Sequence, residues 1–374
     1  MTEPTDSRAF PDTRPNKLIG QTSTDATIST TTTITTVRNT SGAHIQLADV
    51  SKIYPQQAVP AVENFSMDVQ PGELVMFVGP SGCGKTTTMK MINRIIEPSS
   101  GSIQIDGRDV LSLDPNELRR HIGYVIQQIG LFPHMTIAEN ISVVPKLLGW
   151  SKAKISARVD ELLSVVQLDP STFAGRYPKQ LSGGQQQRVG VARALAADPP
   201  VMLMDEPFGA TDPITREKLQ QEFLRLQDTI GKTIIFVTHD FDEAVRLGDR
   251  IAVLSDRSHI EQFDTPAAIL SRPANDYVAS FIGHGAAIKR LGLLPITGVT
   301  LGAAAAASGP VTVPLSDTLR DALDALVVSG QGVVGVADAD GRIVGSLTVD
   351  SISTALGAEV VAPAAGSGAT KTER

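Results

Sequence analysis

The nonapeptide GPSGCGKTT, residues 79–87, constrains the fold of this chain more than any other stretch. It follows the short apolar run 74–78 and precedes a segment, 87–96, whose pattern favours a helix. Glycine at positions 79, 82 and 84 lets the backbone turn until successive N–H groups point at one anion. The N-terminus of the following helix adds partial positive charge. The pattern G-x-x-x-x-G-K-[ST] in this setting predicts a loop that binds the phosphates of a nucleotide.

Each residue of this loop has an expected part in binding ATP and Mg²⁺. The Lys85 ammonium is expected to reach the β- and γ-phosphates, and the Thr86 hydroxyl is expected to bind Mg²⁺. Cys83 is the single cysteine, and we expect maleimide to label it when no nucleotide is bound. The alternative is a glycine-rich turn with a solvated lysine. The predicted cofactor-binding residues here are Gly79, Pro80, Ser81, Gly82, Cys83, Gly84, Lys85, Thr86 and Thr87.

Composition narrows the class of protein. The 374 residues carry a net charge of −7, which argues against a general nucleic-acid partner. One cysteine allows no internal disulfide. The uncharged run near 291–316 is interrupted by prolines and holds few large apolar residues, so it does not read as a membrane span. No signal-peptide pattern opens the sequence. We expect a soluble protein that meets a membrane only through a partner.

The pattern along the chain predicts five regions. Residues 1–42 are rich in threonine and are expected to be disordered. Over 43–285, strands alternate with helices, which predicts a mainly parallel α/β sheet covered on both faces, with a helical insertion within 130–177. A linker is expected over 286–310, a small α+β unit over 311–356, and a disordered tail over 357–374.

Polar side chains follow several of the predicted strands, at the edge where open α/β sheets bind ligands. Asp205 and Glu206 end one apolar strand, so Asp205 is expected to bind Mg²⁺ and Glu206 to orient or deprotonate the attacking water. A helix-capping acid pair is the alternative. His239 ends another strand and is expected to donate to the γ-phosphate, although a lone histidine is more often structural. Gln127 is a candidate contact for Mg²⁺ or for the water.

Two further features complete the predicted site. Tyr54 offers a ring on which adenine can stack, although an aromatic there is more often part of a core. The segment LSGGQ, with Ser182, Gly183, Gly184 and Gln185, opens a helix and makes a second anion-binding N-terminus. One chain with two such surfaces is explained if two copies enclose two nucleotides between them.

Taken together, the motifs resemble those of ABC-transporter ATPase subunits. They are GPSGCGKT, Gln127 before an insertion, LSGGQQQR, VMLMDEPF, GATD and THD, and the resemblance covers residues 44–283. It implies a P-loop NTPase cassette with a helical subdomain, in which Glu206 is the catalytic base, His239 the switch histidine and Asp212 a nucleotide-proximal residue. It also implies that Ser182 to Gln185 act on the partner copy's nucleotide. Thr211 stands where the family usually has leucine, and LSDRSHIEQ lacks the family's usual glycine turn.

A subfamily is also indicated. GYVIQQIGLFPHMTIAENI, HDFDEAVRLGDRIAVL and RPANDYVASFIG resemble the importers of glycine betaine, proline, carnitine and choline. Those ATPases often carry tandem CBS domains, and GRIVGSLTVDSISTAL resembles the end of a single CBS motif. Asp350 follows Thr348 by two residues where the ribose-binding CBS pattern has three, which argues against an adenosine ligand there.

The resemblance implies a function and a set of partners. We expect ATP hydrolysis that powers import of glycine betaine, proline betaine, carnitine or choline through a separate membrane permease, at the cytoplasmic face of the membrane. A solute-binding protein would act indirectly, and a second copy of the chain would complete the nucleotide sites. An importer of an amino acid or a sugar, a non-transport ABC ATPase and a purely regulatory nucleotide-binding module remain alternatives.

Overall fold

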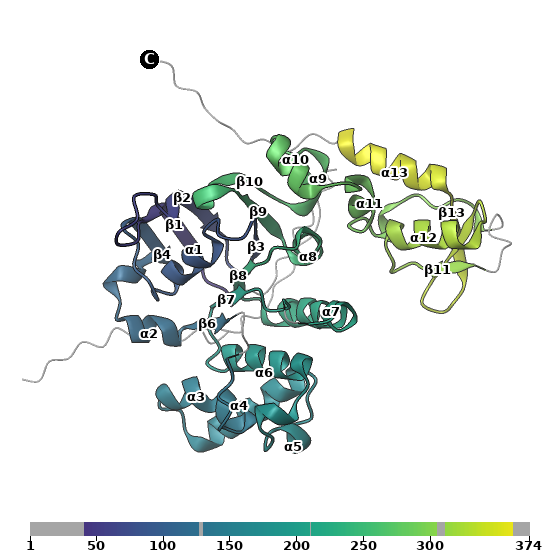
Figure 1. Cartoon of the computed structure of the whole chain (residues 1–374). Coiled ribbons are helices and arrows are strands. Elements are labelled where there is room, and N and C mark those ends of the chain that lie inside the picture. The colour runs from purple at the N-terminus through teal and green to yellow at the C-terminus, as the bar shows by residue number, and fades with distance from the viewer. Residues whose placement is uncertain (1–40, 127–129, 210, 305–310, 362–374) are drawn as a thin grey trace, which may run out of the picture. The chain divides into compact units, whose positions relative to one another are not determined.

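A six-stranded sheet forms the centre of the first domain. The computed structural model describes residues 41–126, 130–209, 211–304 and 311–361. Five strands are parallel, and the sixth, β10, pairs antiparallel with its neighbour. In spatial order the strands are β10 (Ile260–Asp264), β9 (Arg250–Leu254), β3 (Leu74–Val78), β8 (Thr233–Val237), β7 (Val201–Asp205) and β6 (Ile122–Val125) (Figure 1).

The central strands are short apolar runs, as expected for a sheet covered on both faces. Every residue of β3, β7 and β8 is buried. Alternate side chains enter two separate cores: Met76 lies in one and Phe77 in the other. The predicted parallel sheet with two covered faces is therefore confirmed.

A second, antiparallel sheet covers one face. Its strands are β2 (Val62–Val69), β1 (Ile45–Lys52), β4 (Ser100–Ile105) and β5 (Arg108–Asp109), in that order. The buried side chains of β1 alternate with exposed ones at its start, which is the pattern of a strand with one solvated face. These side chains share a core with α1 (Lys85–Ile92) and with one face of the central sheet.

Helices cover the opposite face. They are α6 (Gly183–Leu195), α7 (Pro213–Ile230), α8 (Phe241–Leu247), α9 (Pro266–Ser271) and α10 (Asp276–Ile282). The buried side chains of α6 lie in the core formed by this face, whereas those of α1 lie in the other core. The helix that follows the phosphate loop and the helix that follows LSGGQ therefore pack on opposite faces of one sheet.

The predicted helical insertion contains α3 (Ile137–Leu147), α4 (Lys152–Val165) and α5 (Pro170–Phe173), and the turn η2 (Pro178–Gln180) follows its predicted end at 177. Thr136 and Glu139 form a capping box at the start of α3. Asn140 is fully buried, accepts from the amide of Phe132 and donates to three carbonyls between Phe132 and Thr136. This side chain therefore fixes the loop that enters the insertion.

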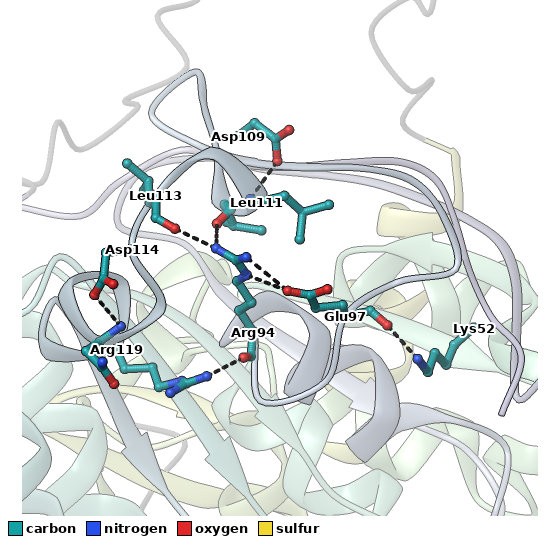
Figure 2. Close-up of polar contacts among 10 residues, drawn as sticks. Lys52, Arg94, Glu97, Asp109, Leu111, Leu113, Asp114 and Arg119 are labelled. Carbon is teal, nitrogen blue, oxygen red and sulfur yellow. Dashed lines mark hydrogen bonds and ion pairs between the residues drawn. The ribbon is translucent and has the colours of Figure 1, made fainter. Parts of the chain in front are cut away.

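Helix α1 ends sooner than the sequence pattern indicated. It stops at Ile92, and Arg94 takes a left-handed conformation with φ of 46°. Figure 2 shows the Arg94 side chain bonding to the Leu113 carbonyl and to the Glu97 carboxylate. Arg94 also donates to the Val110 carbonyl at 3.3 Å. These bonds tie the end of α1 to the turn η1 (Val110–Ser112), which precedes α2 (Pro115–Arg120).

Two more bonds extend this network. Arg119 donates to the Arg94 carbonyl at 2.7 Å, and Lys52 of β1 donates to the Glu97 carbonyl at 2.6 Å (Figure 2). Cations from α2 and β1 thus hold the backbone that follows α1. The far end of the phosphate-loop helix is fixed to the antiparallel sheet by these contacts.

The C-terminal part has its own core. It contains β11 (Thr312–Pro314), α12 (Leu319–Ser329), β12 (Val334–Ala337), β13 (Ile343–Leu347) and α13 (Val349–Val361), with the sheet order β11-β12-β13. The predicted order of strand, helix, two strands and helix matches these elements. Val313, Leu326, Val336 and Leu347 are among its buried residues.

Two boundaries predicted from the sequence differ from the structure. Residues expected to form a linker carry α11 (Ala286–Leu291) and the turn η4 (Ile296–Gly298), and Leu291 and Ile296 are buried in the C-terminal core. The stretch resembles a linker in composition because prolines and small residues outnumber its few large apolar residues. Helix α13 reaches Val361, past the predicted end at 356. The extension 1–40 and the tail 362–374 lie outside the described residues. Among the described helices, none is long and apolar enough to cross a membrane.

Candidate active site

The loop between β3 and α1 has the backbone conformation that its glycines predict. Gly79, Gly82 and Gly84 have φ of 156°, 84° and 110°, all in the region that favours glycine. At Gly79 a Cβ would lie 2.3 Å from the carbonyl oxygen of Leu254 on β9, so close packing also requires glycine there. Pro80, Ser81 and Gly82 are exposed at the tip of the loop, within reach of a ligand.

Lys85 closes the loop on itself. Its Nζ donates to the carbonyls of Gly79 and Pro80, each at 2.8 Å, and the side chain is buried. The Cys83 sulfur lies 3.7 Å from the same Nζ and Cys83 is only 3% exposed. The expectation of a maleimide-accessible thiol is therefore wrong, because the side chain of Cys83 points into the core beneath the loop.

The acid that ends β7, Asp205, contacts the helix after the phosphate loop. The Thr86 hydroxyl donates to Oδ1 of Asp205 at 3.0 Å. Burial raises the pKa of Asp205, the neighbouring Glu206 adds to this, and the bond from Thr86 acts against it. Two oxygens predicted to bind Mg²⁺ thus lie side by side, and a cation there would offset the cost of the buried carboxylate.

Glu206 and His239 follow adjacent strands, β7 and β8 (Figure 1). His239 Nδ1 lies 3.3 Å from Oε2 of Glu206; the histidine side chain is 60% exposed and the glutamate side chain 22%. Glu206 has φ of 43°, which is rare for a residue with a Cβ. Its backbone is held there by bonds to the Val237 carbonyl and from the Gly209 amide. The pair can position a water and move its proton.

Four predicted site positions follow four neighbouring strands. The phosphate loop follows β3, and His239 follows β8. Asp205 ends β7 and Glu206 comes directly after it; these three strands are adjacent in the sheet. Gln127 comes two residues after β6, the next strand, and lies outside the described residues. The parallel order places all of these strand ends at one edge.

Tyr54 lies just beyond β1 and is half-buried. Lys52 Nζ lies 5.5 Å from the centre of the Tyr54 ring, a cation–π contact. The ring is therefore not part of the core, which was the alternative reading of this residue. Its role toward adenine remains a prediction.

Ser182 and Gln185 form a capping box at the start of α6. The Ser182 hydroxyl accepts from the Gln185 amide at 3.3 Å, and Oε1 of Gln185 accepts from the Ser182 amide at 3.0 Å. Gly183 and Gly184 are the first helical residues, and a Cβ at Gly183 would meet no atom within 4 Å. The open N-terminus can accept an anion.

Asp212 caps α7. Its carboxylate accepts from the Thr215 amide at 3.0 Å, and bonds with Thr215 lower the pKa of Asp212. Ordinary helix capping thus accounts for an acid at this position. Thr211 directly precedes Asp212. Arg216 donates to the Thr211 carbonyl at 3.2 Å, and this bond fixes the turn that leads into α7.

A family model described as ABC transporter matches residues 62–209. A glycine betaine/carnitine/choline transport ATP-binding protein of Bacillus subtilis is 60% identical over 239 residues, which cover 64% of this chain and only 62% of that protein. A glycine betaine uptake system ATP-binding protein of Escherichia coli is 47% identical over 303 residues, which cover 81% of this chain and 97% of that protein. The chain belongs to the ABC transporter ATP-binding proteins.

A solved ABC cassette has the same fold. The ATP-binding cassette MJ0796, in a dimeric post-hydrolysis state bound to ADP and Pi, is 37% identical with a TM-score of 0.53. The match covers 59% of this chain and 98% of that one. The predicted fold class, an ABC ATPase cassette, is therefore confirmed for this part of the chain.

One buried acid of this ABC cassette was not singled out from the sequence. Glu243 on α8 is 6% exposed and accepts from Nε2 of Gln220 on α7 at 2.8 Å. The Thr238 side chain also hydrogen-bonds to it, and the Thr238 hydroxyl accepts from the Asp240 amide at 3.0 Å. The two residues beside His239 are thus held through Glu243. The sequence did offer a signal for this residue, since Glu243 is an acid at a position of the helix after THD that its apolar pattern would bury.

Glu243 gives the cassette a predictable dependence of stability on pH. Burial is the main cause of the raised pKa of Glu243. The folded protein therefore binds the proton more tightly than the unfolded chain. The stability from this carboxyl is fully present below its unfolded pKa of about 4.3 and is lost as pH rises through the raised, folded-state value.

We expect Glu243→Gln to remove that loss, because the amide cannot ionise yet retains an oxygen that accepts a hydrogen bond. The difference in free energy of unfolding, variant minus parent, should grow as pH rises above about 4. Urea titrations at several pH values measure it. Asp160→Asn, at an exposed carboxylate on α4, is the control. A difference for Glu243→Gln that stays constant with pH would contradict the assignment.

Proposed function

We propose that this chain is the ATP-hydrolysing subunit of an importer. The observation that carries the proposal is the shared sheet edge: a phosphate-type loop, the Thr86–Asp205 pair and the Glu206–His239 pair follow adjacent strands. In this proposal the backbone amides of residues 79–87 bind the phosphates of ATP. Lys85 would exchange its bonds to the Gly79 and Pro80 carbonyls for the β- and γ-phosphate oxygens. The Tyr54 ring would stack on adenine.

The donor set fits Mg²⁺. Thr86 and Asp205 supply two oxygens, and the described residues hold no cluster of three acidic, histidine or cysteine side chains that would bind a metal unaided. Mg²⁺ commonly takes only one or two protein oxygens and completes its shell with phosphate and water. When bound, the ion would neutralise charge on the phosphates. Gln127 is proposed as a further contact to the ion or to the water.

Glu206 is proposed to act as the general base of hydrolysis, and His239 to stabilise negative charge on the γ-phosphate. The Glu206 carboxylate would accept a proton from the attacking water as its oxygen approaches the γ-phosphorus. The two hydrogen bonds that hold its backbone help, because a catalytic group held in place needs little reorganisation during the reaction. His239, 3.3 Å from Oε2 of Glu206, would donate to the γ-phosphate and keep the carboxylate oriented.

The signature residues Ser182 to Gln185 are proposed to act on the nucleotide of a second copy, with Asp212 near that interface. Two observations support this. The helices that follow the phosphate loop and LSGGQ belong to cores on opposite faces of one sheet, so within one chain they do not enclose a common site. The related cassette MJ0796 is dimeric.

The proposed cargo is a quaternary-amine osmoprotectant: glycine betaine, proline betaine, carnitine or choline. It rests on the 60% identity with the Bacillus protein for glycine betaine, carnitine and choline. The chain would bind at the cytoplasmic side of a membrane permease, and a solute-binding protein would deliver the cargo from the other side.

Uptake by cells that lack this gene tests the cargo. We expect loss of labelled glycine betaine, carnitine or choline uptake at high osmolarity, restored by the intact gene and not by one encoding Glu206→Gln. Labelled amino acids and sugars serve as controls. If uptake of an amino acid or a sugar were lost instead, with osmoprotectant uptake unchanged, that solute would be the cargo. Normal uptake of every solute would reject a transport role.

The C-terminal unit is proposed to be a single CBS-like domain that regulates transport. Support comes from its motif GRIVGSLTVDSISTAL and from its order of strand, helix, two strands and helix. Thr348 caps α13 by accepting from the Ser351 amide at 3.2 Å. That hydroxyl therefore serves the helix rather than standing free for a ribose.

A further inference from the structure

The turn between β9 and β10 has an unusual backbone. In η3 (Asp256–Ser258), Arg257 and Ser258 have φ of 59° and 61°. Two consecutive residues with a Cβ in the left-handed region are unfavourable, because Cβ crowds the following carbonyl. This is the segment LSDRSHIEQ, where the sequence has no glycine to relieve the strain.

Ser258 is buried against the phosphate loop. Its amide donates to the Cys83 carbonyl at 2.6 Å, and its hydroxyl donates to the same oxygen at 3.1 Å. It is 1% exposed, and its Oγ lies 3.3 Å from the Thr88 hydroxyl. A Cβ at Gly84 would come within 2.3 Å of the Ser258 Oγ, so the turn and the loop are in direct contact.

These bonds fix one peptide plane of the loop. In a trans peptide the C=O and the next N–H point in opposite directions. Because the Cys83 carbonyl points toward Ser258, the Gly84 N–H points away from it. A loop that binds phosphate needs its N–H groups turned to the ligand side and its carbonyls turned away.

We propose that Ser258 is a positioning residue for nucleotide binding: by holding the Cys83 carbonyl it pre-orients the Gly84 N–H toward the phosphates of a nucleoside di- or triphosphate. This rests on the proposed function, since it assumes that the loop binds a nucleotide. Arg257 shares the strained conformation, but its side chain is half exposed and pairs with Glu63 of β2 at 2.8 Å.

The neighbouring strained residues supply a matched set of variants. Ser258→Ala and Ser258→Gly both remove the hydroxyl, but glycine also relieves the left-handed strain. We expect both to weaken binding of MgADP and MgATP by about three- to tenfold, the usual worth of one hydrogen bond. We also expect Ser258→Gly to unfold at a higher urea concentration than Ser258→Ala. Arg257→Gly relieves the same kind of strain without touching the loop and should bind as the parent does.

Titration calorimetry on the full chain gives the affinities, and ATPase kinetics should show a raised KM with kcat unchanged. Parent-like affinity in Ser258→Gly would overturn the proposal. If only the alanine variant were impaired, nucleotide affinity would follow stability, and Ser258 would be a purely structural residue. A parent protein that binds neither nucleotide would instead refute the proposed function, which is a distinguishable outcome.

Discussion

Glu206→Gln is expected to keep MgATP binding and to slow hydrolysis by about 10²–10⁴, the usual cost of removing a general base. The amide preserves the shape of the side chain and a contact with His239, 3.3 Å from the carboxylate in the parent. It cannot accept the proton of the attacking water. Phosphate release under saturating MgATP measures the rate, and a fluorescent ATP analogue measures binding.

A stable complex of two chains should also appear. If two copies enclose the nucleotide, a variant that binds ATP without hydrolysing it should elute as a dimer with MgATP and as a smaller species with MgADP. Glu217→Gln, at an exposed acid on α7, is the matched control and should behave as the parent does. Hydrolysis at the parent rate in Glu206→Gln would remove this residue from the proposed role.

Lys85→Ala is expected to lower the affinity for MgATP by about 10- to 10²-fold or more. A hydrogen bond to a charged group contributes about 1.5–3 kcal/mol, and the buried ammonium is placed to make more than one. In the structure it donates to two loop carbonyls rather than to a carboxylate, so a phosphate has no strong ion pair to displace.

Calorimetric titration with MgATP checks this effect, and Lys146→Ala, at an exposed lysine of α3, is the control. The Lys85 variant should fold as the parent does, because the loop glycines and the apolar contacts of α1 remain in place. Unchanged affinity in a folded Lys85→Ala protein would mean that the loop binds no nucleotide phosphate.

The features that sequence could predict are those with a short-range pattern. The runs Leu74–Val78, Val201–Asp205 and Thr233–Val237 are mostly apolar, and a glycine, an acid or a histidine stands at the end of each or within two residues of it. Buried parallel strands have that composition, and their alternation with helices predicts that they pair in parallel. The positions of Asp205, Glu206 and His239 at one edge came from the same reasoning.

The features that sequence could not predict depend on contacts between distant segments. Ser258 meets the phosphate loop 175 residues away, and nothing near it in the sequence indicates that partner. The burial of Cys83 depends on how the loop lies over the core, which the loop's composition does not determine. Residues 291 and 296 looked like linker because a few apolar side chains among prolines and glycines become buried only in the folded unit.

The placement of α1 and α6 on opposite faces of the sheet has a genetic consequence. In a sandwich of two copies, each composite site would take its phosphate loop from one chain and its LSGGQ from the other. When a chain damaged at Lys85 pairs with a chain damaged at Ser182, both lesions fall in one composite site and the other site is intact. Two alleles that are each inactive alone would then partly complement each other. When both lesions lie on the same chain and every chain carries both, each composite site contains both lesions and no activity would return.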